Sequence, residues 1–219
     1  MKVLVIAAHP DDEVLGCGGA IAKLSSEGHE VKILVFGEGP SARGPINRDA
    51  VKAQAQNAAK ILGAELIDIL GYPDNRFDEF AILDLAREIE RARADFPAEL
   101  ILTHHAGDLN QDHRQIAAAT FVSCRPINKE PPELWCYEVP SSTEWGMLTS
   151  EVFRPNLFVK IDESSWKKKI RALREYKTEV RKFPHPRSPE SLDALSRTRG
   201  SQAGLERAEA FYIARKVLR

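Results

Sequence analysis

The fold is decided by an apolar run that ends in a charged motif, Val3-Leu4-Val5-Ile6-Ala7-Ala8-His9-Pro10-Asp11-Asp12-Glu13. An uninterrupted apolar run of this kind is typical of a strand buried on both faces of a parallel sheet. The motif that follows delivers an imidazole and two adjacent carboxylates to the end of that strand. Because open α/β sheets bind ligands at the carboxyl ends of their strands, this stretch predicts both the fold class and the place of a functional site.

A second apolar run, Leu100-Ile101-Leu102, is followed by another group of potential ligands. Residues 103–114 contain three of the six histidines in the chain: His104, His105 and His113. If both runs are strands of one sheet, the two polar groups lie at the same edge of that sheet. We therefore expect His9 and Asp12 to lie close to His113.

Two imidazole nitrogens and one carboxylate oxygen form a ligand set that zinc accepts, and catalytic zinc sites keep a further position open for water. His9, Asp12 and His113 would supply this set. The neighbouring Asp11 leaves the backbone in a different direction and remains available as a general base. A divalent ion lowers the pKa of a coordinated water to about 7, and a carboxylate within hydrogen-bond reach can take its proton during attack on a carbonyl. The pattern indicates amide hydrolysis.

Two structural interpretations compete with this one. Asp11 or Asp12 could simply cap the following helix, although the presence of two clusters at two strand ends argues against it. Residues 16–19 read Gly-Cys-Gly-Gly, which matches neither the dinucleotide fingerprint nor a P-loop. We therefore expect no nucleotide cofactor, a tightly packed helix at these small residues, and Cys17 as a core thiol rather than a metal ligand.

The motif at residues 9–13 and the later Asp112-His113-Arg114 closely resemble the PIG-L/LmbE-like family of zinc-dependent N-acetyl-sugar deacetylases. The likeness covers most of the chain, including residues 72–78, 107–110, 139–145 and 184–188. The resemblance implies that His9, Asp12 and His113 hold the metal and that Asp11 is the general base. It also implies a homo-oligomer, because relatives commonly self-associate. Iron or cobalt is an alternative to zinc, since N/O ligand sets accept several such ions.

One position departs from the family pattern. Many members carry a histidine three residues before the final ligand, where this chain has Asn110. An amide can donate a hydrogen bond to an oxyanion, but it cannot transfer a proton at neutral pH. The leaving amine is then protonated by Asp11 itself or with the help of His104 or His105. We expect His105 to form a polar network with Asp108, and either histidine is equally consistent with orienting a ligand.

Composition limits the fold and the partners. A chain of 219 residues with 43% hydrophobic residues fits one domain over 1–219, with a core over about 1–130 and a C-terminal helical elaboration over about 131–219. The 31 basic and 32 acidic residues offer no electrostatic case for nucleic acid binding. Three cysteines without metal-site spacing favour a reducing compartment. Because no segment approaches the roughly 18 apolar residues of a membrane span, we expect a cytoplasmic protein.

Apolar runs alternate with amphipathic segments, which predicts a Rossmann-like, mainly parallel α/β sheet flanked by helices. The expected strands cover residues 2–8, 31–36, 65–70, 100–103, 134–137 and 157–161. Helices are expected through 20–24 and over 47–62, 82–89, 164–180, 189–199 and 205–218. A further helix is expected to begin near Asp112, with Asp112 as its cap and His113 in its first turn.

The candidates for substrate binding are Arg48, Asp74, Arg76, Glu144, Trp145, His185 and Arg187. Glu144 and Trp145 lie in a loop that combines hydroxyls with an aromatic face, as sugar sites do. The alternative is a packed surface loop without a role in binding. Asp74 and Arg76 either bind hydroxyl, carboxylate or phosphate groups of the substrate or form an ion pair with each other. Arg48 lies at a predicted helix start, where the helix dipole disfavours a cation, and this misfit favours an anionic ligand. His185 and Arg187 lie in a proline-rich loop that completes a pocket in the same subunit, reaches a neighbouring subunit, or only packs structurally.

Three functions follow from these observations. The leading prediction is a hydrolase that removes acetyl from an N-acetylated amino sugar or its conjugate, giving acetate and a free amine. The second is a metal amidase acting on a non-sugar amide or a thiol conjugate. The third is a metal-binding relative with little activity, because Asn110 replaces the usual acid. Retention of both Asp11 and Asp12 argues against the third, since a binding protein has no need of a base.

Overall fold

A computed structural model describes residues 1–127, 130–147 and 151–217 of the chain. Seven strands form one sheet in the order β3-β2-β1-β4-β5-β7-β6. The five parallel strands are β1 (Lys2–Ala7), β2 (Glu30–Gly37), β3 (Glu65–Tyr72), β4 (Leu100–His104) and β5 (Glu133–Tyr137). At the other edge, β7 (Ala208–Arg215) runs antiparallel to both β5 and β6 (Leu157–Lys160). The predicted α/β class with a mainly parallel sheet is confirmed.

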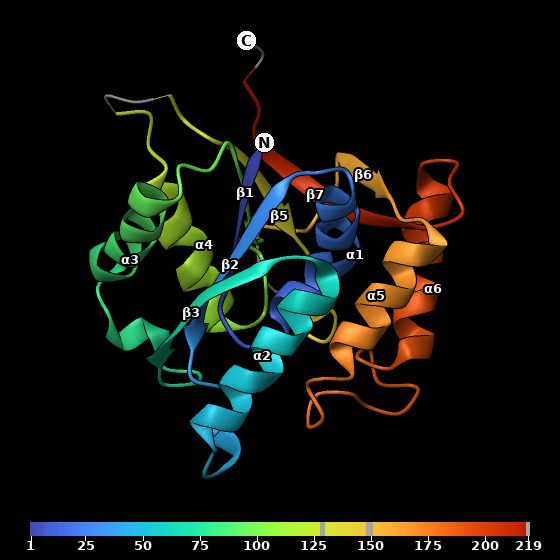
Figure 1. Cartoon of the computed structure of the whole chain (residues 1–219), viewed down its shortest axis with the longest axis horizontal. Helices are drawn as coiled ribbons and strands as arrows, with labels where there is room; N and C mark the ends of the chain where they lie inside the picture. Colours follow the sequence, from blue (N-terminus) through green and yellow to red (C-terminus); the bar gives the residue numbers. More distant parts are fainter. Residues whose placement is uncertain (128–129, 148–150, 218–219) are drawn as a thin grey trace.

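Helices cover both faces of the sheet (Figure 1). One face carries α1 (Asp12–Ser26), α2 (Arg48–Leu62), α5 (Glu163–Leu173) and α6 (Pro189–Gln202), and the other carries α3 (Ile82–Asp95) and α4 (Gln111–Ser123). In the described part of the chain, three short 3-10 turns lie in the connections: η1 (Ser41–Arg43), η2 (Phe77–Glu79) and η3 (Thr143–Trp145). Among the described residues, no helix combines the length and the apolar character needed to cross a lipid bilayer.

The central strand β1 is buried on both faces, as its sequence predicts. Val3, Val5 and Ala7 pack into the core beneath α1 and α2, while Leu4 and Ile6 pack into the core beneath α3 and α4. These two cores supply the apolar burial that stabilises the sheet from both sides. Helix α2 ends at Gly63, whose φ of 80° is left-handed, which confirms the predicted C-cap.

The strand order reverses beside β1. The chain passes from β1 to β2 and β3 on one side and then returns to β4 on the other, where Val3 pairs with Leu100 and Val5 with Leu102. This arrangement is the topological switch point at which open α/β sheets bind ligands. The segments that follow β1 and β4 therefore lie next to each other.

Two predictions for the C-terminal part were wrong. The helix expected over 164–180 ends at Leu173, because the chain turns there and Tyr176 donates a hydrogen bond to Glu13. Where a helix was expected over 205–218, the structure instead has strand β7 at Ala208–Arg215, residue 218 lying outside the described residues. Its aromatic and β-branched stretch Phe211–Ile213 pairs with β5, whose free edge offers backbone partners. The C-terminal part thus extends the sheet with strands as well as adding helices.

Helix α1 is interrupted at Cys17, whose φ of −140° and ψ of 19° are not helical. The interruption frees backbone groups that two buried side chains then satisfy. The Glu209 carboxylate accepts hydrogen bonds from the amides of Gly19 and Ala20, and Lys169 Nζ donates to the carbonyl of Leu15. Lys169 and Glu209 also form an ion pair with each other at 2.5 Å. A negative charge at the start of one half-helix and a positive charge at the end of the other complement the helix dipoles.

Close packing explains the small residues in this helix. A Cβ atom on Gly16 would lie 2.3 Å from a ring carbon of Tyr137, so no larger residue fits there without movement. Cys17 is fully buried, and Cys124 and Cys136 are also free and buried. The interpretation of Cys17 as a core thiol is confirmed.

We expect Glu209→Gln to destabilise the fold by about 3–5 kcal/mol, because it leaves the Lys169 ammonium buried without a counter-charge. Urea unfolding of the variant measures this effect. Adding Lys169→Met should recover much of the loss, since the unpaired charge is then removed. The exposed pair of Lys23 and Glu27 is the matched control, and Glu27→Gln should change stability by no more than about 0.5 kcal/mol. An equally small effect of Glu209→Gln would contradict this interpretation.

Candidate metal centre and catalytic cavity

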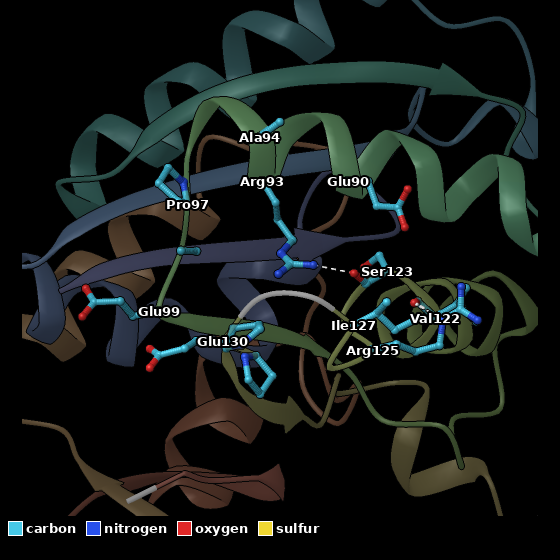
Figure 2. A pocket seen from close by; sticks show the side chains of 13 residues that line it. Glu90, Arg93, Ala94, Pro97, Glu99, Val122, Ser123, Arg125, Ile127 and Glu130 are labelled. Atoms are coloured by element: carbon cyan, nitrogen blue, oxygen red, sulfur yellow. Dashed lines mark hydrogen bonds between the residues drawn. The ribbon is translucent and has the colours of Figure 1, made fainter. Parts of the chain in front are cut away.

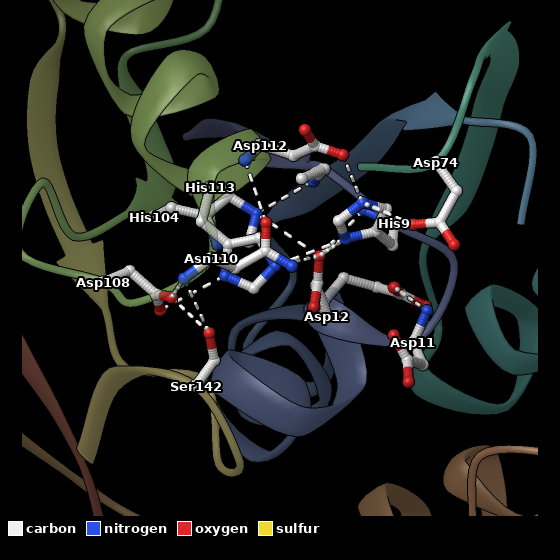
Figure 3. Close-up of polar contacts among 12 residues, drawn as sticks. His9, Asp11, Asp12, Asp74, His104, Asp108, Asn110, Asp112, His113 and Ser142 are labelled. Carbon is white, nitrogen blue, oxygen red and sulfur yellow. Dashed lines mark hydrogen bonds and ion pairs between the residues drawn. The ribbon is translucent and has the colours of Figure 1, made fainter. Parts of the chain in front are cut away.

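Three predicted ligands converge at the switch point (Figure 3). His9 follows β1, Asp12 begins α1, and His113 lies in the first turn of α4. His9 Nδ1 lies 3.3 Å from His113 Nε2 and 3.4 Å from Asp12 Oδ2, and the last two atoms are 3.2 Å apart. Tetrahedral zinc with bonds of about 2.0–2.1 Å places its ligand atoms about 3.3–3.4 Å from one another. The three atoms therefore form one face of a tetrahedron of the size that zinc requires.

A carboxylate behind His9 sets the orientation of its ring. His9 Nε2 lies 2.9 Å from Asp112 Oδ2, which directs Nδ1 toward Asp12 and His113. Asp112 is itself held by the backbone amides of Asn75 and Phe77, at 2.7 and 3.0 Å. The expectation that Asp112 caps α4 was wrong. Asn110 is the N-cap, and its side chain accepts the amide of Asp112.

A second carboxylate forms an ion pair with the His113 ring. Asp108 Oδ2 lies 3.2 Å from His113 Nδ1, which leaves Nε2 facing the candidate metal position. The hydroxyls of Ser142 and Thr143 donate hydrogen bonds to Asp108 and fix it. The predicted network of Asp108 with His105 is therefore replaced by one with His113. Carboxylates that bond the outer nitrogen of a histidine ligand fix its tautomer and its orientation.

The electrostatics of the cluster follow from its burial. Burial lowers the pKa of His9, but hydrogen bonds and the charges of Asp112 and Asp12 overcome it and raise the pKa to about 10. His113 behaves similarly, since Asp12 and Asp108 raise its pKa to about 9 against the effect of burial. For Asp12, burial raises the pKa, yet the adjacent histidine cations hold it well below its usual range. A cation held by these atoms would compete with protons for the same nitrogens.

His104 and His105 do not line the cavity beside the three candidate ligands. His104 is fully buried, stacks on the ring of His113 at 4.1 Å, and its Nε2 accepts the amide of Ala8. Burial and the His113 cation lower the pKa of His104 to about 3, so it stays neutral and supports the ligand next to it. His105 packs edge-on against the rings of Phe153 and Tyr212. Neither placement favours the expected help with protonation of a leaving amine.

Asp11 is held apart from the three ligands. Its φ of 127° is unusual for a residue with a side chain, and its carboxylate makes no helix-capping hydrogen bond. Asp11 Oδ2 instead accepts a hydrogen bond from Arg187 Nη1 at 2.9 Å. Burial raises the pKa of Asp11 to about 8, although the Arg187 cation opposes the rise. Strained backbone held in place by its surroundings is concentrated at functional sites.

Asn110 has an amide orientation that its neighbours determine. Because the backbone N–H of Asp112 donates to it at 2.8 Å, the accepting atom must be Oδ1. The Nδ2 group then lies on the side of Asp12 in Figure 3. Among the described residues, no hydrogen bond is made by Nδ2, and Asn110 lines the cavity beside His9. The side chain therefore offers a free N–H donor at the site.

A cavity of about 60 Å³ lies against these groups. Two of the predicted substrate residues, Asp74 and Arg187, line it. Asp74 Oδ1 is 3.3 Å from His9 Nε2, and with Asp112 these residues form a second group able to hold a metal, which the sequence did not reveal. A carboxylate in each group already accepts backbone amides, Asp112 from Asn75 and Phe77 and Asp12 Oδ2 from His9 at 2.8 Å. We favour the group built on Asp12 and His113 because it offers two imidazoles with one carboxylate, a donor set typical of catalytic zinc.

The other predicted substrate residues do not line this cavity. Arg48 forms an ion pair with Glu38, and Arg76 pairs with Glu79 rather than with Asp74. Glu144 accepts the backbone amides of Ser141 and Ser142. The remaining two, Trp145 and His185, face each other edge-on with ring centres 6.3 Å apart.

A larger cavity lies away from the site. It measures about 530 Å³ and lies where β4 and β5 begin, at the opposite end of these strands. Figure 2 shows Arg93 of α3 reaching across it to the backbone carbonyl of Ser123. Glu90, Glu99 and Arg125 also line it. It contains none of the candidate ligands, so we place the chemistry in the smaller cavity.

Comparisons with known proteins agree with this geometry. The family model described as PIG-L, GlcNAc-PI de-N-acetylase, matches residues 4–123. The chain is 31% identical to the uncharacterized deacetylase YaiS of Escherichia coli, over 80% of this chain and 90% of that protein. It is 32% identical to 4-oxalmesaconate hydratase of Pseudomonas putida, over 78% of this chain and 71% of that protein.

A solved structure shows the same fold. N,N'-diacetylchitobiose deacetylase from Pyrococcus horikoshii superimposes with a TM-score of 0.77, at 20% identity, over 97% of this chain and 83% of that one. The family model spans more than half of the chain and contains His9, Asp11, Asp12 and His113. Because its sequence matches the family model and its fold and these residues agree with that match, the protein belongs to the PIG-L (GlcNAc-PI de-N-acetylase) family.

Proposed function

We propose that the protein is a zinc-dependent hydrolase that removes the acetyl group from an N-acetylated amino sugar or its conjugate, releasing acetate and a free amine. The observation that carries this proposal is the tetrahedral spacing of His9, Asp12 and His113 beside a separate, buried carboxylate, Asp11. A ligand set with a base next to it is what metal-assisted hydrolysis needs. The deacetylases among its relatives support an amide substrate.

The donor set fits zinc in type and in spacing. His9 Nδ1, His113 Nε2 and Asp12 Oδ2 would hold the ion, with Asp112 and Asp108 orienting the two rings. A zinc ion would supply Lewis acidity, which makes water more acidic and polarises the substrate carbonyl. Iron and cobalt accept the same ligands and are the alternatives.

Asp11 moves the proton in this proposal. Its carboxylate takes a proton from the attacking water as the new carbon–oxygen bond forms. When the carbon–nitrogen bond then breaks, the same group returns the proton to the leaving amine. Arg187 orients the carboxylate through its 2.9 Å hydrogen bond. A single residue thus serves as base and then as acid, which the asparagine at position 110 cannot do.

Asn110 stabilises the charge that develops on the substrate oxygen. Its N-cap bond holds the amide so that Nδ2 faces the cavity. A donor that is fixed before the reaction needs no reorganisation when the oxyanion forms. Asn110 therefore stabilises the oxyanion, which is one of the two roles of the histidine that other members of the family carry at this position.

A second candidate function is the addition of water to a carbon–carbon double bond. The 32% identity with the Pseudomonas putida hydratase over 78% of this chain favours it. A base beside a metal site can activate water for either reaction. Hydrolysis of a non-sugar amide is a third possibility that the same residues would support.

Acetate release from a panel of N-acetylated amino sugars tests the proposal. We expect turnover by the zinc-loaded protein and its loss on treatment with a chelator. Asp11→Asn should retain the metal and lower kcat at least about 10²-fold, because the base is removed. His113→Ala should lose both metal and turnover, whereas Asp84→Asn on the exposed part of α3 should behave like the parent.

The zinc content of each variant is measured as well, because it separates loss of catalysis from loss of the metal. Loss of zinc from Asp11→Asn would show that the roles of the two carboxylates are exchanged. A zinc-loaded parent that releases no acetate, yet hydrates an unsaturated dicarboxylate as followed by ultraviolet absorbance, would favour the second candidate.

The dual role of Asn110 gives a separate prediction. Asn110→Asp and Asn110→Ser both keep an N-cap acceptor, so melting temperature and zinc content should stay at the parental level. Both remove the amide donor, and we expect kcat to fall about 10²–10³-fold. Asn110→Ala is the contrasting variant, which should also lose about 1 kcal/mol of stability with the cap. Parental kcat in both capping variants would remove Asn110 from the catalytic machinery.

A further inference from the structure

The catalytic cavity is too small for a complete substrate. Its volume is about 60 Å³, whereas sites for small molecules and cofactors have volumes of about 300–1,000 Å³. A cavity of this size accommodates the reacting acetamido group but not the body to which it is attached. The rest of the substrate must therefore lie in a space that adjoins the catalytic cavity.

A second cavity of about 410 Å³ adjoins it. The two cavities share four lining residues: Pro10, Pro40, Arg43 and Glu179. The second cavity extends from there between α2 and the segment that follows α5. Its volume falls within the range of ligand sites.

An ion pair forms the movable part of the shared wall. Arg43 Nη1 lies 3.0 Å from both carboxylate oxygens of Glu179. The Glu179 side chain is buried, while that of Arg43 is 52% exposed. Because Arg187 also binds Glu179 at 2.7 Å and Asp11 at 2.9 Å, Glu179 keeps a cationic partner when Arg43 turns away. Rotation of the exposed arginine would then join the two cavities without leaving a buried carboxylate unpaired.

The lining of the second cavity indicates what it accepts. Pro45, Ile46 and Val51 give it an apolar wall. Arg43 and Arg181 supply cations. Among the described residues that line this cavity, Glu179 is the one carboxylate, and two guanidinium groups already share it. No hydrogen bond or ion pair engages Arg181 among the residues that the structure describes. Arginines with free donors favour carboxylate and phosphate groups, which they bind with charge-assisted hydrogen bonds.

We infer that the second cavity is the subsite for the body of the substrate and that this body carries an oxyanion, a carboxylate or a phosphate, which Arg181 and Arg43 bind. The acetamido group then reaches the catalytic cavity past the shared wall. This inference rests on the proposed deacetylase function for the identity of the reacting group. The prediction of an anionic group rests on the two arginines that line the second cavity, and it does not depend on the deacetylase function.

Calorimetric titration with deacetylated amines tests the inference without turnover. The ligands are glucosamine as its methyl glycoside, its carboxymethyl glycoside and its 1-phosphate, which share a sugar and differ in the anion. We expect the zinc-loaded protein to bind at least one anionic ligand about tenfold or more tightly than the methyl glycoside. The comparison between the carboxymethyl and phosphate ligands distinguishes the two sources of the oxyanion.

Variants assign the effect to the cavity. Arg181→Gln should remove most of the preference for the anionic ligand while leaving the affinity for the methyl glycoside within about twofold. Arg87→Gln, on the opposite face of the sheet where Arg87 pairs with Asp84, is the control and should keep the preference. Equal binding of neutral and anionic ligands, or a preference that persists in Arg181→Gln, would overturn the inference.

Failure of the inference is distinguishable from failure of the proposed function. Acetate release without any preference for an anionic ligand leaves the deacetylase proposal in place and removes the subsite. Tight, Arg181-dependent binding of an anionic ligand without acetate release from its N-acetylated form keeps the oxyanion subsite and removes the proposed reaction.

Discussion

Pairing of β1 with β4 is the contact on which the site depends. Residues 9 and 113 are 104 positions apart, and the parallel register of these two strands brings the segments that follow them together. His104 continues the contact beyond the last paired residues, since its Nε2 accepts the amide of Ala8. A slip of this register by one residue would reverse which side chains face each core and would move the candidate ligands apart.

Burial of charge is the second constraint. Histidines and carboxylates removed from water are costly unless each has a partner. Asp112 and Asp108 meet this requirement for the two rings, and they are fixed in turn by backbone amides and by hydroxyls. The same contacts orient the nitrogens before any cation arrives. Preorganisation and stability thus come from one set of hydrogen bonds and ion pairs, as a precise metal site would require.

The amino-acid sequence predicts the parallel strands and the three converging ligands, because apolar runs and the polar motifs after them are local signals. The prediction that Asp112 caps α4 was wrong, because Asn110 is an equally good cap and the backbone amides of the distant segment at 75–77 bind the Asp112 carboxylate instead. Strand β7 was mistaken for a helix because its partners β5 and β6 are remote in sequence. The contact of Arg187 with Asp11 spans 176 positions and leaves no local pattern.

Anomalous X-ray diffraction at the zinc absorption edge, from crystals of the zinc-loaded protein, tests the central claim most directly. We expect one strong peak at about 2.0–2.2 Å from each of His9 Nδ1, Asp12 Oδ2 and His113 Nε2. A peak between His9 Nε2, Asp74 and Asp112 would contradict the claim, because the ion would then lie in the other group of potential ligands. The absence of any peak near His9 would contradict it as well.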